Sequence, residues 1–174
     1  MTSPRTDIAL TLERLWQFSL QYYSVREVKE ACLSLQNHFH GNVNLLLTLK
    51  FLDEQQASFH NEDWHKIQDC LGRSEQLLHQ FRELRRQLKP NVPDTLYRQS
   101  LEFELSLEKQ QQSDLVSCIN SLQLEDNTDD PLCLRYCRQL GAEHLGRVFT
   151  SLSSPMRTST STSTSTSTST STTK

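Results

Sequence analysis

Residues 94–122 read DTLYRQSLEFELSLEKQQQSDLVSCINSL, and this stretch decides the fold. It contains neither Gly nor Pro and follows Pro93, so it predicts one long helix that begins at Asp94. One side of that helix repeats in steps of four and three, through Leu101, Leu105, Glu108, Gln112, Leu115, Ile119 and Leu122. This spacing is a heptad stripe, which predicts packing against other helices, and two of its central members are polar.

The composition of the whole chain supports the helical class. The 174 residues include 28 Leu but only 6 Val and 3 Ile, together with 15 Gln and 4 Gly. Leu and Gln suit helices, whereas β-branched residues suit strands. The composition therefore excludes a β-sandwich or barrel and argues against a Rossmann-type sheet. The hydrophobic fraction of 35% is low partly because residues 158–173 are only Ser and Thr.

The spacing of apolar residues, together with Gly, Pro and capping residues, predicts further helices in the rest of the chain. We expect these at residues 7–23, 24–39, 43–52, 61–72, 74–88 and 131–140, with a weaker segment at 142–152. The segment 43–52 is apolar almost all round, which predicts that it is the central, most buried element. Gly72 should end one helix and separate it from the next. The turn from Pro90 to Pro93 should make its two flanking helices antiparallel neighbours.

We therefore predict an all-α fold, an irregular bundle of six or seven helices with a disordered C-terminal tail. A single domain spans residues 7–152, and residues 153–174 form the Ser/Thr tail, because neither face of its alternating repeat is apolar. Two helix starts carry recognisable caps. Ser24 and Glu27 have the spacing of a capping box, and Asn42 can cap the central helix.

The polar centre of the long helix is the most unusual feature of the sequence. Glu108 and Gln112 occupy positions that the period assigns to the interior, where a carboxylate is costly unless it is paired. Three alternatives stay open: an internal Glu108–Arg73 bridge, a polar pocket within the bundle, or a seam that opens to solvent. The candidate binding residues are Trp16, Asn44, Arg73, Glu104, Glu108 and Gln112.

A basic cluster ends the helix that precedes the Pro-bracketed turn. Its members are Arg82, Arg85, Arg86 and Lys89, and the acidic residues Asp94, Glu102 and Glu104 follow early in the next helix. In an antiparallel hairpin these two ends face each other, so intramolecular ion pairing is one interpretation. A basic patch for a phosphorylated or acidic partner is the alternative.

Charge and motifs exclude several classes of function. The net charge of −3 argues against a nucleic-acid partner, and no apolar run is long enough to span a membrane. The five Cys form no Cys-x-x-Cys pair, which favours reduced thiols in the cytoplasm. Glu62 and His65 make a single Glu-x-x-His pair, and Cys133 and Cys137 have no second pair to complete a metal site. We therefore predict no metal, no cofactor and no catalytic residue.

Three blocks of residues carry a resemblance to a known family. They are Trp16, Phe18, Ser19 and Tyr23; then Ala31, Cys32, Leu33, Leu35 and Gln36; then Gly41, Val43, Asn44, Leu46 and Leu47. In these blocks and their spacing the chain resembles a small proteobacterial family of unknown function, and the resemblance continues more weakly over residues 10–142. Members usually carry Asp where Asn42 stands. The resemblance implies a small cytoplasmic helical protein and implies no particular reaction.

Two functions of different classes fit these observations. The first is a cytoplasmic, non-catalytic interaction or adaptor protein with a protein partner, because the exposed helix faces are rich in Gln and charge. The alternative is a small-ligand binder or enzyme that uses a polar pocket around Glu104 and Glu108, so enzymatic activity stays undecided. Nucleic-acid binding through the basic cluster is a third hypothesis, and it would require salt-sensitive binding.

Overall fold

The computed structural model describes residues 3–151, and the Ser/Thr tail predicted at 153–174 lies outside the described residues. The helices are α1 (Leu12–Tyr23), α2 (Arg26–Phe39), α3 (Val43–Glu54), α4 (Trp64–Leu88), α5 (Asp94–Asn120), α6 (Leu132–Gln139) and α7 (Glu143–Ser151), with a 3₁₀ turn at Asn61–Asp63. The prediction of an all-α fold with six or seven helices is therefore confirmed.

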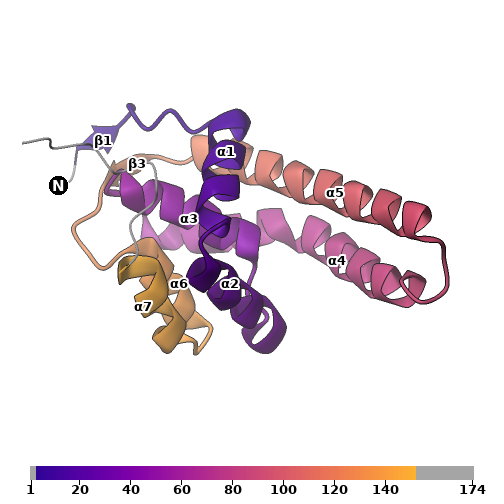
Figure 1. The fold of residues 1–174 in the computed structure, drawn as a ribbon. Coiled ribbons are helices and arrows are strands. Elements are labelled where there is room, and N and C mark those ends of the chain that lie inside the picture. The colour runs from indigo at the N-terminus through magenta and orange to yellow at the C-terminus, as the bar shows by residue number, and fades with distance from the viewer. Residues whose placement is uncertain (1–2, 152–174) are drawn as a thin grey trace, which may run out of the picture.

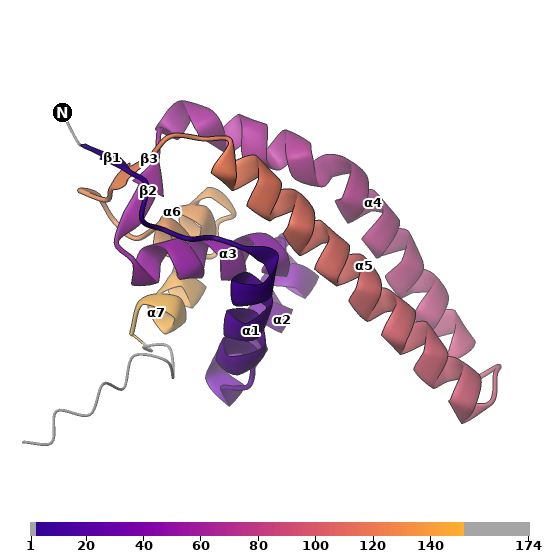
Figure 2. The ribbon, with the colours of Figure 1, turned by 90° about the horizontal axis from the view of Figure 1, so that it is seen from above.

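The longest helices, α4 and α5, form an antiparallel hairpin whose far end projects from the rest of the molecule (Figures 1 and 2). The other helices gather around α3 at the opposite end. Every residue from 44 to 52 in α3 is buried, which confirms that this segment is the central element. We call residues 76–108, which make up the projecting part of the hairpin, the arm, and the remaining described residues the body.

A small antiparallel sheet joins three segments at the far end of the body from the arm. Its strands are β1 (Pro4–Arg5), β2 (Ala57–Phe59) and β3 (Leu124–Asp126), in the order β1-β3-β2. Arg5 Nη1 donates to Asp126 Oδ1 across the β1–β3 pair at 2.7 Å. The sequence predicts neither helix nor strand at these positions, because strands of two or three residues are too short to show alternation in a sequence.

The single helix α4 corrects the expectation of two helices separated at Gly72. The helix runs through Gly72 because nothing in its packing requires a break: Leu71 and Leu78 are both buried on one side of it. Gly in a helix interior costs only about 1 kcal/mol relative to Ala, which tertiary packing overcomes. Ser74 does not cap a new helix, and its Oγ instead donates to the carbonyl of Leu71 at 3.2 Å.

Of the predicted caps, Asn42 is confirmed and the capping box is wrong. The Asn42 side chain accepts a hydrogen bond from the backbone N–H of Leu45 at 2.7 Å. The N-cap residue of α2 is Val25, and the hydroxyl of Ser24 instead donates to the carbonyl of Gln21 at 2.6 Å. Ser24 thus serves the end of α1 rather than the start of α2.

The heptad stripe of α5 divides where the body ends. Leu115 and Ile119 are fully buried in the body, as the stripe predicts. Leu101 and Leu105 lie in the arm, where they are 40% and 49% exposed. The polar centre of the stripe therefore lies at the junction between body and arm, and the candidate site is found there.

Candidate functional site

A pocket lies at the junction of body and arm, between α1, α3 and α5. It has a volume of about 190 Å³ and is lined by Trp16, Ser19, Leu20, Tyr23, Val43, Asn44, Leu47, Leu105, Glu108 and Gln112. Four of the six predicted binding residues, namely Trp16, Asn44, Glu108 and Gln112, thus line one pocket. We call this pocket, together with the neighbouring Leu101 one turn along α5, the inner groove.

The wall formed by α1 presents apolar side chains to the groove. The buried residues of α1 are Leu15, Phe18, Ser19 and Tyr22. Leu20 is 51% exposed at the groove, and Trp16 and Tyr23 are half-buried beside it. The ammonium group of Lys109 lies 5.4 Å from the centre of the Trp16 ring, which is a cation–π distance.

The floor of the groove is a buried network of amide side chains. Gln112 Nε2 donates to Ser19 Oγ at 3.0 Å and to Asn44 Oδ1 at 3.2 Å. Asn44 Nδ2 donates to Gln111 Oε1 at 2.9 Å. Gln112 is 1% exposed, and its Oε1 has no hydrogen-bond partner among the described residues. A buried acceptor without a donor is costly, so this atom marks a place where an incoming donor would be stabilised.

Gln111 extends the same network toward α4, and sequence reasoning missed it. Its Oε1 also accepts from Asn42 Nδ2 at 3.1 Å, and its Nε2 donates to Ser74 Oγ at 3.0 Å. The Asn42 amide donates as well to the carboxylate of Glu75. Gln111 is fully buried, although its neighbours in the sequence are also Gln. A run of three Gln in a long helix was the signal available, because at least one of them had to face a neighbouring helix.

The carboxylate of Glu108 pairs with Arg82, so the alternative of an internal Glu108–Arg73 bridge is wrong. Arg82 Nη2 donates to Glu108 Oε1 at 3.4 Å. Arg73 is exposed and lies on the other side of the hairpin, in a groove with Leu77 and Leu107. Burial raises the pKa of Glu108 above its ordinary value, and the charge of Arg82 offsets part of that rise. Glu108 therefore stands at the rim of the groove as a partly desolvated carboxyl group.

Glu104 does not line the pocket, which corrects its place in the expected site. It is 8% exposed, in the seam between α4 and α5. Arg85 Nε donates to Glu104 Oε2 at 2.7 Å, and Arg82 Nε lies 3.6 Å from Glu104 Oε1. For two members of the basic cluster, Arg82 and Arg85, these contacts agree with the interpretation of ion pairing within the chain.

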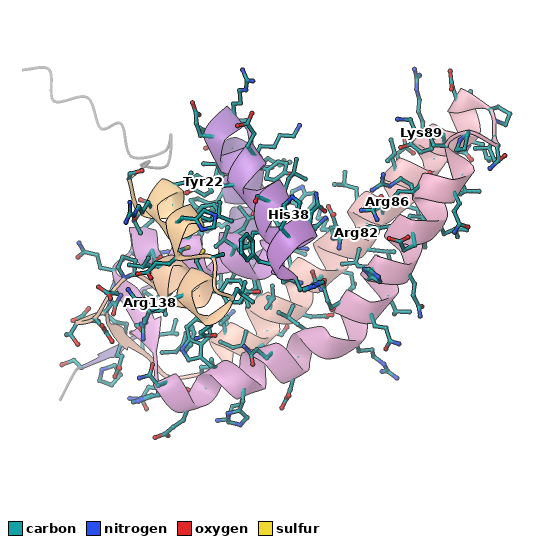
Figure 3. All side chains as sticks on the ribbon, turned by 90° about the horizontal axis from the view of Figure 1, so that it is seen from below. Tyr22, His38, Arg82, Arg86, Lys89 and Arg138 are labelled. Atoms are coloured by element: carbon teal, nitrogen blue, oxygen red, sulfur yellow. The ribbon has the colours of Figure 1, made fainter. Side chains whose placement is uncertain are left out.

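The other two members of the cluster are less constrained. Arg86 Nη1 lies 2.5 Å from Glu83 Oε1, one turn away on the same helix, and the ammonium group of Lys89 lies 5.9 Å from the centre of the Tyr97 ring. Arg82 and Arg86 also line a second, larger cavity of about 490 Å³ between α2 and α4. Figure 3 shows these two arginines on the side of the arm that faces His38 of α2.

The buried thiols of the body are poor nucleophiles. Burial raises the pKa of Cys32 and of Cys137 to about 12 and raises that of Cys133 as well. Within residues 3–151, no group of three or more His, Cys, Asp or Glu side chains is placed to hold a metal ion. None of the helices described is both long and apolar enough to cross a membrane.

Comparison with known proteins places the chain in a family without a known activity. The model of a family described as "Protein of unknown function (DUF2390)" matches residues 14–115, which is 102 of the 174 residues. The match includes every residue of the inner groove and the whole arm. No curated protein and no solved structure matches the chain.

Proposed function

We propose a function from the premise that this chain belongs to the family DUF2390, whose function is unknown. The protein is a non-catalytic interaction module, an adaptor, and its partner is another protein. The partner presents an amphipathic helix that lies in the inner groove. Its apolar side packs on Leu20, Leu101 and Leu105, and one of its polar side chains donates a hydrogen bond to Gln112 Oε1.

The observation that carries this proposal is the divided stripe of α5. Helices pack through rows of side chains at i, i+4 and i+7. The body covers only the C-terminal half of this row on α5. Leu115 is fully buried, whereas Leu105 is 49% exposed on the same side of the helix. A partner helix continues the packing that α1 and α3 begin, which is the helix-in-groove mode of recognition.

The size of the pocket favours a side chain over a free small molecule. Sites for drug-sized ligands usually enclose about 300–1,000 Å³. The pocket of the inner groove has a volume of about 190 Å³, which suits a single inserted side chain. The alternative of a small-ligand binder or enzyme at Glu104 and Glu108 has less support, because Glu104 is held by Arg85 in the hairpin seam.

We infer further that the protein works in the cytoplasm of a bacterial cell. All five cysteines are free thiols, as a reducing compartment maintains them. The bacterial origin rests on the motif resemblance given above. The net charge of −3 and the pairing of Arg82 and Arg85 with Glu104 argue against nucleic acid as the partner.

A library of displayed helical peptides, selected on the full chain, tests the groove directly. We expect enriched peptides with apolar residues at i, i+3 or i+4, and i+7, and with one Arg, Lys or Gln among them. Leu105→Glu should weaken their binding at least tenfold, since it places a charge at the centre of the contact. Leu33→Glu is the matched control, because Leu33 is a 38% exposed Leu on α2, outside the groove.

A Gln112→Leu variant examines the polar contact separately. It should weaken the peptides that carry a donor and leave purely apolar peptides unaffected, since only the former use Gln112 Oε1. The proposal fails if no peptide is enriched over scrambled sequences. It also fails if the enriched peptides bind Leu105→Glu as tightly as they bind the unmodified chain.

A further inference from the structure

The side of the arm opposite the inner groove is apolar and exposed. Six side chains form it, which we call the outer face: Leu77, Phe81, Leu84, Leu96, Phe103 and Leu107. Four of them, Leu77, Leu84, Leu96 and Phe103, are 56%, 49%, 51% and 55% exposed. An apolar patch of this size on a protein surface is often functional, and docking of another protein is one of its common uses.

Helical spacing and contacts place these six residues on one surface. Leu77 and Leu84 are seven residues apart on α4, as are Leu96 and Phe103 on α5, so each pair shares a helix side. The two helices meet where the Phe81 and Phe103 ring centres lie 5.2 Å apart. A shallow groove of about 230 Å³ also joins Leu77 of α4 to Leu107 of α5.

Polar side chains without charge border much of the outer face. They include Gln80, Gln87, Gln99, Ser106 and Gln110, while the exposed Glu83 and Glu102 lie further round the two helices. Two oppositely charged pairs of the arm, Arg82 with Glu108 and Arg85 with Glu104, lie in the seam instead. Where the shallow groove reaches the body, its lining includes both Arg73 and Asp114, of opposite sign. Charges of one sign therefore do not dominate this surface, which limits like-charge repulsion between two copies.

The apolar area of the outer face suits a modest but specific dimer. An aromatic side chain presents about 150–250 Å² when fully exposed and Leu less, so one Phe and three Leu that are about half exposed leave roughly 300 Å². Two copies that face each other bury roughly twice that area from these side chains alone. The other two apolar residues and the Gln rim add to it, which approaches the ~1,200–2,000 Å² of a standard interface.

From these observations we infer that the protein forms a dimer through the outer face, with a second copy of this chain as the occupant. The same patch serves both subunits, so the contact closes on itself with two-fold symmetry. The two arms then make a four-helix bundle, in which each hairpin buries the apolar surface of the other. Both inner grooves remain open, because they lie on the opposite sides of their arms.

Sedimentation velocity of the full chain over a range of micromolar concentrations tests the dimer. We expect the mass to rise from 20.2 kDa to twice that value as the concentration increases. Leu84→Glu and Leu96→Glu should each hold the mass at 20.2 kDa, since each places a charge in the interface. Both positions are about half exposed, so at a concentration low enough for the unmodified chain to be monomeric, both variants should retain its thermal unfolding curve. Leu33→Glu should still dimerise.

Three results would overturn this inference. One is a mass of 20.2 kDa at the highest concentration, another is growth beyond a dimer, and the third is dimerisation of both charged variants. Crossed variants separate this inference from the proposed function. Leu105→Glu should lose the selected peptides and keep the dimer, whereas Leu84→Glu should lose the dimer and keep the peptides.

Discussion

The two halves of α5 follow one sequence pattern and reach opposite environments. Leu115 is fully buried and Leu105 is 49% exposed, although both belong to the same stripe and lie ten residues apart. The C-terminal half packs against α1 and α3. Because α1 ends at Tyr23, it does not continue along the N-terminal half of the stripe. An apolar stripe therefore predicts a surface that can pack against another helix. The lengths of the neighbouring helices decide how much of that surface the chain itself covers.

The largest effect that this comparison predicts is a difference between two identical substitutions. Leu115→Ala should lower the free energy of unfolding by about 3 kcal/mol, because it leaves a cavity in the body. Leu105→Ala should change it by less than about 0.5 kcal/mol, because its side chain is already half in water. Urea denaturation followed by circular dichroism measures both. Equal losses would mean that the arm is packed as tightly as the body.

The sequence was sufficient to place most of the helices, because each of them buries a strongly periodic apolar side. It was not sufficient to find the seam between α4 and α5. That seam includes Ser100, Glu104, Leu107 and Gln111, which are buried or half-buried. A pattern of apolar residues cannot reveal a seam that is largely polar, and the apolar pattern of α5 points to the stripe one residue away instead.

The candidate site was predictable in the same partial way. Glu108 and Gln112 stood out because polar residues interrupted an apolar stripe, and the structure places both at one pocket. The partner of Glu108 was not predictable, because the choice between Arg73 and Arg82 depends on how the two helices are rotated against each other. Spacing within one helix defines a side of that helix, but the rotation of its neighbour is set by packing across the seam.

Within the arm, ion pairs replace part of the apolar packing, and the second prediction concerns them. Arg82 is 8% exposed and lies between Glu104 and Glu108. Arg82→Ala should lower the free energy of unfolding by about 2 kcal/mol, because it leaves a buried carboxylate without part of its compensation. Hydrogen exchange should show the loss in the amides of the arm before those of α3.

Arg86→Ala is the control for this prediction. Arg86 and Glu83 form an ion pair in which both side chains are 51% exposed, so its loss should change the free energy of unfolding by less than about 0.5 kcal/mol. Uniform exchange throughout α3 and the arm after Arg82→Ala would contradict the separation of the two regions.

The third prediction is a smaller effect, and it uses pH. Burial holds the pKa of Glu108 above its ordinary value of 4.5. A carboxyl group whose pKa is raised on folding stabilises the fold below its unfolded pKa, and that contribution is lost as the pH rises through the folded pKa. Glu108→Gln should therefore become progressively more stable than the unmodified chain as the pH rises above about 4.5. Paired denaturation curves at several pH values measure this difference, and a constant difference would refute the raised pKa.

The smallest predicted effect lies where α4 leaves the body for the arm. A Cβ atom added at Gly72 meets no atom within 4 Å, so Gly72→Ala gains helix propensity without a clash. It should raise the free energy of unfolding by about 0.5–1 kcal/mol. Gly41→Ala is the contrasting control, because a Cβ atom there would lie 2.5 Å from Cγ of the buried Leu35. If thermal unfolding shows that Gly72→Ala destabilises the protein as Gly41→Ala does, then α4 bends at Gly72 in solution, and the arm begins as a separate helix.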